Sequence, residues 1–292
     1  MAHTTSPLQS TFLLGRLFIG AAFAAMATAT LAVPASGEAL RERHARLAPE
    51  IAASPFQRPL VVQSSESGSE LRGSVDAVMP QPYALAREHL QRPEALCEIL
   101  MLQINTKQCV VQGRELVVHI GRKHDQPLED AYRVAFTVQP QSASDEHMGV
   151  RLVAESGPFS TRDFRIQLQA IPLSGGSRTY LHLGYSYGIG LPARLAMQGY
   201  LATKGASKVG FTRQGDDYIG GMRGAIERNT MRYYLAIEAY LASLAAPPAQ
   251  QRTVRLERWF GATEQYARQL HEIERTDYLA MKQREYRRLQ SS

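Results

Sequence analysis

Alternating apolar and polar positions dominate the middle of the chain. In residues 131–139, Val134, Phe136 and Val138 fall on one side, and residues 148–154, 164–171 and 179–187 repeat this spacing. A period of two is typical of half-buried β-strands. Glycine and proline turns separate the segments, so we expect a meander of antiparallel strands. Shorter segments of the same kind precede it at residues 60–62, 71–79, 108–111 and 114–122.

A helical period appears in several other segments. The strongest is residues 222–244, whose apolar stripe contains Ile226, Thr230, Tyr234, Ile237, Leu241 and Leu244. Pro247-Pro248 ends this helix. The pattern also predicts two short helices before the strands, a helix with a glycine-rich stretch after them, and a charged helical tail, at residues 83–90, 94–101, 193–203, 204–221 and 253–290.

The order of these elements resembles that of a known superfamily. A strand, two short helices, about six antiparallel strands and a long helix follow one another over residues 60–244. This order is similar to the helix-grip fold of the START-like (SRPBCC) superfamily, which includes polyketide cyclase-like and lipid-transfer proteins. The helix and glycine-rich stretch at residues 193–221 depart from it, because the family usually joins its last strand to its last helix by a short loop.

The resemblance implies an α+β fold. Its curved antiparallel sheet of about six or seven strands would wrap around the long C-terminal helix, with two short helices and an extra C-terminal helical tail. It also implies an apolar cavity between sheet and helix, where a ligand would bind. We expect a signal peptide, an N-terminal leader, the START-like domain and a charged helical extension at residues 1–37, 38–59, 60–246 and 247–292.

The first part of the chain has the pattern of an export signal. A lone Arg16 precedes the uncharged apolar run at residues 17–33, and the small residues Ala35 and Gly37 follow. This spacing predicts cleavage before Glu38 and a periplasmic or secreted protein. An uncleaved inner-membrane anchor at residues 17–33 and a buried helix remain alternatives, since the run is at the lower limit of length for a spanning helix.

Charge and cysteine content narrow the choice of partner and compartment. The formal net charge of the chain is +6, with basic and acidic residues interspersed, which argues against a nucleic-acid partner. In an oxidising compartment, the two cysteines, Cys97 and Cys109, favour a structural disulfide over free thiols or redox and metal chemistry. No histidine has ligand spacing to this pair, so we expect no metal site.

Two groups of side chains are candidates for binding a ligand. Arginine forks suit carboxylate or phosphate groups, and Arg228 stands in a polar cluster at the start of the long helix. Aromatic side chains on the strands and this helix would line the cavity. The candidate ligand-binding residues are Arg223, Glu227, Arg228, Arg232, Tyr234, Tyr185, Tyr187 and Phe136. The alternatives are ion pairs that anchor the glycine-rich loop, and aromatics that simply fill the core.

These observations predict an exported protein that holds a hydrophobic small molecule or lipid between sheet and long helix. A membrane surface is a further candidate partner. An enzyme on the same scaffold, with cyclase-like or hydrolytic activity through Arg228 or a pocket histidine, is one alternative. It is less favoured, because the sequence contains no nucleophile elbow or paired-carboxylate motif. A protein that docks a partner through residues 253–290 is another, and we expect no cofactor.

Overall fold

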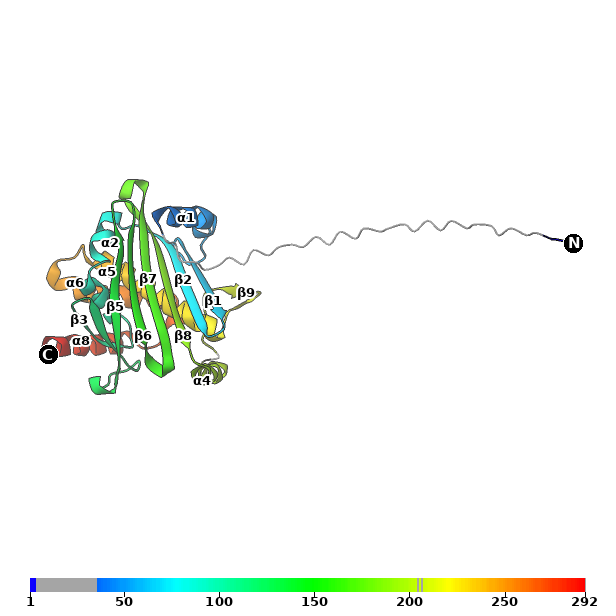
Figure 1. The fold of residues 1–292 in the computed structure, drawn as a ribbon. Coiled ribbons are helices and arrows are strands. Elements are labelled where there is room, and N and C mark those ends of the chain that lie inside the picture. The colour runs from blue at the N-terminus through cyan, green and yellow to red at the C-terminus, as the bar shows by residue number, and fades with distance from the viewer. Residues whose placement is uncertain (4–35, 204, 206, 292) are drawn as a thin grey trace. The chain divides into compact units, whose positions relative to one another are not determined.

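The computed structural model describes residues 1–3, 36–203, 205 and 207–291, so the predicted export segment lies outside the described residues. An eight-stranded sheet dominates it, with every neighbouring pair antiparallel and the strand order β1-β2-β8-β7-β6-β5-β4-β3 (Figure 1). The strands are β1 (Leu60–Ser67), β2 (Glu70–Met79), β3 (Thr106–Gln112), β4 (Glu115–Ile120), β5 (Tyr132–Ala143), β6 (Met148–Ser156), β7 (Thr161–Leu173) and β8 (Arg178–Ile189).

Eight α-helices and a small hairpin complete the described part of the chain. The hairpin pairs β9 (Arg213–Gln214) with β10 (Asp217–Tyr218) inside the glycine-rich stretch. The helices are α1 (Gly37–Ala52), α2 (Tyr83–His89), α3 (Pro93–Met101), α4 (Leu191–Ala202), α5 (Gly221–Ser243), α6 (Pro248–Glu264), α7 (Ala267–Leu270) and α8 (Arg275–Ser291).

The α+β class and the meander agree with the sequence, but the strand count does not. The sheet has eight strands rather than six or seven. The first two strands join the meander because β2 pairs with β8, with Val75 opposite Leu183. This contact links segments far apart in the chain, so local periodicity could not reveal it. The arrangement is broadly consistent with a helix-grip fold.

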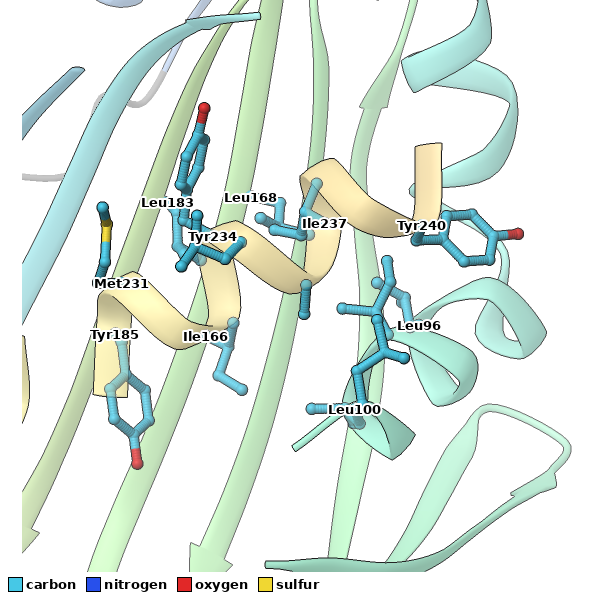
Figure 2. Packing of buried hydrophobic residues seen from close by; sticks show 14 of the residues in the cluster. Leu96, Leu100, Ile166, Leu168, Leu183, Tyr185, Met231, Tyr234, Ile237 and Tyr240 are labelled. Atoms are coloured by element: carbon cyan, nitrogen blue, oxygen red, sulfur yellow. The ribbon is translucent and has the colours of Figure 1, made fainter. Parts of the chain in front are cut away.

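Helix α5 packs across the inner face of the sheet. Figure 2 shows Tyr234 and Ile237 of α5 near Leu168 and Leu183 of the strands, with Leu96 and Leu100 close to the part of the helix that bears Ile237 and Tyr240. The approach to β2 is close, since a Cβ on Gly73 would lie 2.4 Å from the hydroxyl oxygen of Thr230. The predicted stripe of α5 therefore forms the centre of the core.

The expected N-terminal leader is a helix that covers the outer face of the sheet. Leu40, Leu47 and Ile51 of α1 pack against apolar residues of β1, β2, β7 and β8. Its N-cap is Ser36, whose Oγ accepts a hydrogen bond from the Ala39 amide at 3.2 Å. The cut expected before Glu38 would fall inside the first turn of α1 and remove this cap.

The C-terminal extension also differs from the expected single helix, because it folds as α6, α7 and α8. Trp259 and Tyr278 are both fully buried in the main core. The Trp259 indole N–H donates to the Arg232 carbonyl of α5 at 3.2 Å, and the Tyr278 hydroxyl donates to the Leu102 carbonyl at 2.9 Å. These helices are part of the same hydrophobic core as the sheet.

Charged residues of α8 are buried with a partner on the sheet. Glu285 accepts a hydrogen bond from Lys107 of β3 at 3.1 Å and forms an ion pair with Lys282 at 2.8 Å. Burial lowers the pKa of Lys282 to about 8, although the charge of Glu285 opposes the shift. The tail is therefore charged in composition and yet held by buried contacts.

Cys97 on α3 and Cys109 on β3 form the expected disulfide, with their Cα atoms 5.5 Å apart. This bond ties the helix pair to the edge strand of the sheet. No helix within the described residues is long and apolar enough to cross a membrane.

Candidate functional site

Five aromatic rings gather near the end of the sheet where β8 leads into α4. Phe164 stacks on Tyr187 with centroids 5.3 Å apart and meets the Phe136 ring edge-on at 6.3 Å. Tyr185 lies 5.6 Å from Tyr187 and 5.3 Å from Tyr233 of α5. We call Phe136, Phe164, Tyr185, Tyr187 and Tyr233 the aromatic cluster. Strands β5, β7 and β8 and helix α5 each contribute to it, because inward positions alternate along the strands.

The three tyrosine hydroxyls of this cluster have no hydrogen-bond partner among the described residues. Tyr185 and Tyr187 are buried, with 7% and 9% of their surface exposed, and Tyr233 is half-buried. Burial raises the pKa of Tyr187 and Tyr233 to about 12, and that of Tyr185 well above its usual value. All three hydroxyls therefore stay protonated at neutral pH and can donate a hydrogen bond.

Tyr234 does not join the aromatic cluster. Figure 2 shows its hydroxyl and that of Tyr185 pointing in opposite directions. Its pKa is raised well above the usual value, first by burial and then by the charge of Glu238, which pairs with Arg58 at 3.0 Å. Tyr233, the preceding residue on the helix, takes the position that the sequence assigned to Tyr234. Helical periodicity does not decide which of two adjacent tyrosines faces the site.

Glu227 anchors the glycine-rich loop to α5. Its carboxylate accepts from the Phe211 and Thr212 amides at 2.6 and 2.9 Å, and from the Ser64 and Thr212 hydroxyls at 2.6 and 2.8 Å. The loop lies so close that a Cβ on Gly210 would come within 2.4 Å of this carboxylate. Arg223 donates to the Ser64 hydroxyl and carbonyl at 3.2 and 3.1 Å. Glu227 thus anchors the loop by hydrogen bonds rather than by the ion pairs that the sequence left as an alternative, whereas Arg223 attaches the start of α5 to β1.

A cluster of cations surrounds Glu272 in the loop between α7 and α8. The carboxylate pairs with Lys123 and Arg232 at 2.8 Å each and with Lys208 at 3.5 Å. Burial would raise the pKa of Glu272, but these cations hold it below its usual value. Sequence reasoning missed Lys123, Lys208 and Glu272, since three separate loops bring them together.

Arg228 belongs to the same region but has no carboxylate of its own. Its Nη1 donates to the Lys208 and Val209 carbonyls at 3.0 and 3.2 Å. Burial, followed by repulsion from Arg232, lowers the pKa of Arg228 to about 10. It remains a cation at neutral pH, and its charge acts on the Tyr187 hydroxyl of the aromatic cluster.

A hollow of about 540 Å³ lies between α4 and the start of α5. Glu66, Leu201, Ile219, Met222 and Arg223 are among its lining residues. Its volume is within the range of small-molecule sites in proteins. Of the sequence-predicted ligand residues, Arg223 lines it.

Apolar side chains are exposed around this end of the sheet. Phe159, Leu191 and Leu195 are 67%, 69% and 60% exposed, and Tyr132 and Tyr200 about half. The Tyr132 and Phe159 rings lie 5.4 Å apart, while Leu191 and Leu195 are on α4, at the lower end of the sheet in Figure 1. Among the described residues from Ser36 onward, these five are the large hydrophobic residues with exposed side chains.

The histidines that might have served in acid–base chemistry lie elsewhere. His182 is buried on the outer face of the sheet, where its Nδ1 is 2.9 Å from Asp76 beneath α1. His119 follows the inward-facing Val118 on β4, so it also faces outward. The described residues contain no group of three His, Cys, Asp or Glu side chains that could hold a metal ion. The site offers tyrosine and arginine donors beside aromatic rings, a combination suited to binding.

Comparisons with known proteins find similar solved structures of low sequence identity. No family model matches the chain, and no curated protein matches it. Similar solved structures include a protein from Thermus thermophilus (12% identity, 61% of this chain and 99% of that one, TM-score 0.36) and the Zhui aromatase/cyclase from Streptomyces sp. R1128 (12% identity, 68% and 95%, TM-score 0.30). Another is a protein of unknown function from Enterococcus faecalis (9% identity, 69% and 91%, TM-score 0.31). These TM-scores are too low to support an inference about this protein. The strand order and the packing of α5 across the sheet are by themselves consistent with a helix-grip arrangement.

Proposed function

We propose that this protein is exported and binds a hydrophobic small molecule or lipid at the aromatic cluster, between the sheet and α5. The observation that carries the proposal is the set of three tyrosine hydroxyls among aromatic rings that have no hydrogen-bond partner in the described part of the chain. Aromatic rings offer a large apolar contact, and a buried tyrosine hydroxyl usually finds a hydrogen-bond partner. A ligand with an apolar body and a few polar atoms would supply both.

The surroundings of the cluster support the same proposal. The hollow beside α4 is at the same end of the molecule as the exposed Phe159, Leu191 and Leu195. Contiguous exposed apolar side chains mark ligand, membrane or protein contact sites. Exchange of a lipid at a membrane surface would use such a rim.

The proposal is tested by binding of the neutral apolar dye N-phenyl-1-naphthylamine, which fluoresces in an apolar site. Ala154 is buried directly opposite Phe164 across the β6–β7 pair. Ala154→Phe would place a second ring beside Phe164. Dye binding should weaken about tenfold or more, because this ring takes the place of contacts between the dye and the cluster. Ala135→Phe is the matched control, since Ala135 lies between the inward-facing Val134 and Phe136 and so faces outward.

Native mass spectrometry of the protein from its producing cells provides an independent readout. A co-purified hydrophobic molecule that is lost in Ala154→Phe supports the proposal. Equal dye binding by both variants, with unliganded protein in the mass spectrum, would overturn it.

A further inference from the structure

Buried cations in the described part of the chain follow one rule, and Arg228 breaks it. Six lysine and arginine residues are buried. Five of them have a carboxylate within 3.1 Å, in the pairs Arg43–Asp76, Lys107–Glu285, Arg232–Glu272, Arg255–Glu98 and Lys282–Glu285. Arg228 is 7% exposed, and within the described residues it has no ion pair. A buried charge is costly unless it is paired, so this exception needs a reason.

The hydrogen bonds of Arg228 leave part of its guanidinium free. Only Nη1 donates, to the carbonyls of Lys208 and Val209. In the described part of the chain, Nε and Nη2 make no hydrogen bond, and the residue as a whole keeps 7% of its surface exposed. These two atoms form the edge of the fork that binds a carboxylate or phosphate in bidentate fashion.

The charges around Arg228 also favour an added anion. Arg232 repels Arg228, whereas the carboxylates of Glu272 and Glu227 attract it. Both carboxylates are already occupied: Glu272 by Lys123, Lys208 and Arg232, and Glu227 by the loop amides and hydroxyls. This region therefore holds four cations, Lys123, Lys208, Arg228 and Arg232, but two carboxylates. A bound anion would reduce the repulsion among the cations.

We propose that Arg228 binds the acidic group of the ligand, so that the ligand class is an apolar molecule with one carboxylate or phosphate group. This rests on the proposed function, because the charge of Arg228 acts on the Tyr187 hydroxyl of the aromatic cluster. The apolar body lies against Phe164 and Tyr187, while the anion accepts from the free edge of Arg228. The tyrosine hydroxyls donate to remaining oxygens.

Four probes test this class, each competing with N-phenyl-1-naphthylamine at pH 7. They are dodecanoate, dodecyl phosphate, 1-dodecanol and inorganic phosphate. The two acids are used below their critical micelle concentrations and the alcohol below its solubility limit. A charge-assisted bond to arginine should make the two acids about tenfold or more better competitors than the alcohol. Inorganic phosphate, which has no apolar body, should not displace the dye.

Arg228→Gln should bring the acids and the alcohol to within about twofold of one another while dodecanol binding persists. Arg58→Gln is the matched control, because it removes one positive charge on the far side of α5, where Arg58 pairs with Glu238. A second measurement does not need a variant: ¹³C-carboxyl NMR of labelled dodecanoate bound to the wild-type protein. Its pKa should be lower than that of free dodecanoate, since Arg228 stabilises the ionised form.

Equal competition by dodecanoate, dodecyl phosphate and dodecanol would overturn the assignment of Arg228 and leave the proposed function intact. A bound carboxyl that titrates at or above its free pKa would do the same. Competition by inorganic phosphate equal to that of dodecyl phosphate would show that the apolar body contributes nothing, and would also reject the assignment. Failure of the dye and of dodecanol to bind would instead refute the proposed function.

Discussion

Arg43 of α1 and Asp76 of β2 form a bidentate ion pair on the outer face of the sheet. The guanidinium Nε and Nη2 donate to the two carboxylate oxygens at 2.8 and 2.7 Å. The Tyr180 hydroxyl also donates to Asp76 at 2.7 Å, and His182 contacts it at 2.9 Å. This buried network attaches α1 to the sheet.

The network predicts a specific loss of stability in acid. Burial would raise the pKa of Asp76, but the charge of His182 and the hydrogen bonds from Arg43 hold it well below its usual range. As pH falls, the unfolded chain therefore takes up this proton first. The contribution of ionised Asp76 to the free energy of unfolding is complete above the pKa of the unfolded chain, near 4, and is lost as pH falls further. Denaturant unfolding at a series of pH values should show this decline in the wild type and a flatter profile in Asp76→Asn.

Asp76→Asn should also cost about 3–5 kcal/mol at neutral pH, because it leaves Arg43 buried without its carboxylate. Asp145→Asn is the control, since Asp145 pairs with Arg87 at the surface, where ion pairs contribute little. A loss of stability in acid that is the same in Asp76→Asn and wild type would contradict the assignment.

Glu227→Gln should loosen the glycine-rich loop. An amide cannot accept the four hydrogen bonds that the carboxylate receives, so the Phe211 and Thr212 amides lose an acceptor. Hydrogen exchange of residues 207–221 should become faster, by about tenfold for each 1.4 kcal/mol lost. The control is Glu238→Gln on the same helix, and equal exchange in the two variants would show that Glu227 does not anchor the loop.

The C-terminal helices are expected to be required for folding. Trp259→Ala removes a fully buried ring and its hydrogen bond to the Arg232 carbonyl. The cost should be about 3–5 kcal/mol, measured by denaturant unfolding, whereas Arg258→Ala at the exposed neighbouring position should change little. Deletion of residues 247–292 should abolish cooperative unfolding. A deleted protein that unfolds at the wild-type midpoint would instead identify these helices as an independent appendage.

Under the proposed export, the N-cap of α1 favours cleavage before Ser36 over the site before Glu38 that the sequence predicts. Val33 and Ala35 provide acceptable residues at positions −3 and −1, and this cut keeps the N-cap of α1, which contributes about 1 kcal/mol. Intact mass and N-terminal sequencing of protein from the periplasm or medium measure the site. A mature chain that starts at Glu38 would show that the cap is dispensable, and one that starts at Met1 would favour the anchor.

Local pattern alone predicted much of the fold. The two-residue spacing of Val134, Phe136 and Val138 identified β5 and its inner face, and the stripe through Ile226 and Ile237 identified α5. The presence of Cys97 and Cys109 predicted the disulfide. Strand and helix periods depend on neighbours within a few positions, so a sequence carries this information directly.

Tertiary contacts decided the rest. The pairing of β2 with β8 set the strand count, and the burial of Trp259 made the charged tail part of the core. Tyr233 rather than Tyr234 joined the aromatic cluster, Arg43 reached Asp76, and Arg228 alone among buried cations had no described carboxylate partner. Each depends on residues distant in the chain whose approach is set by packing of the whole molecule. The sequence by itself determined the elements and their faces, whereas only the tertiary structure decided which side chains meet, because burial and pairing of charges arise from contacts between elements.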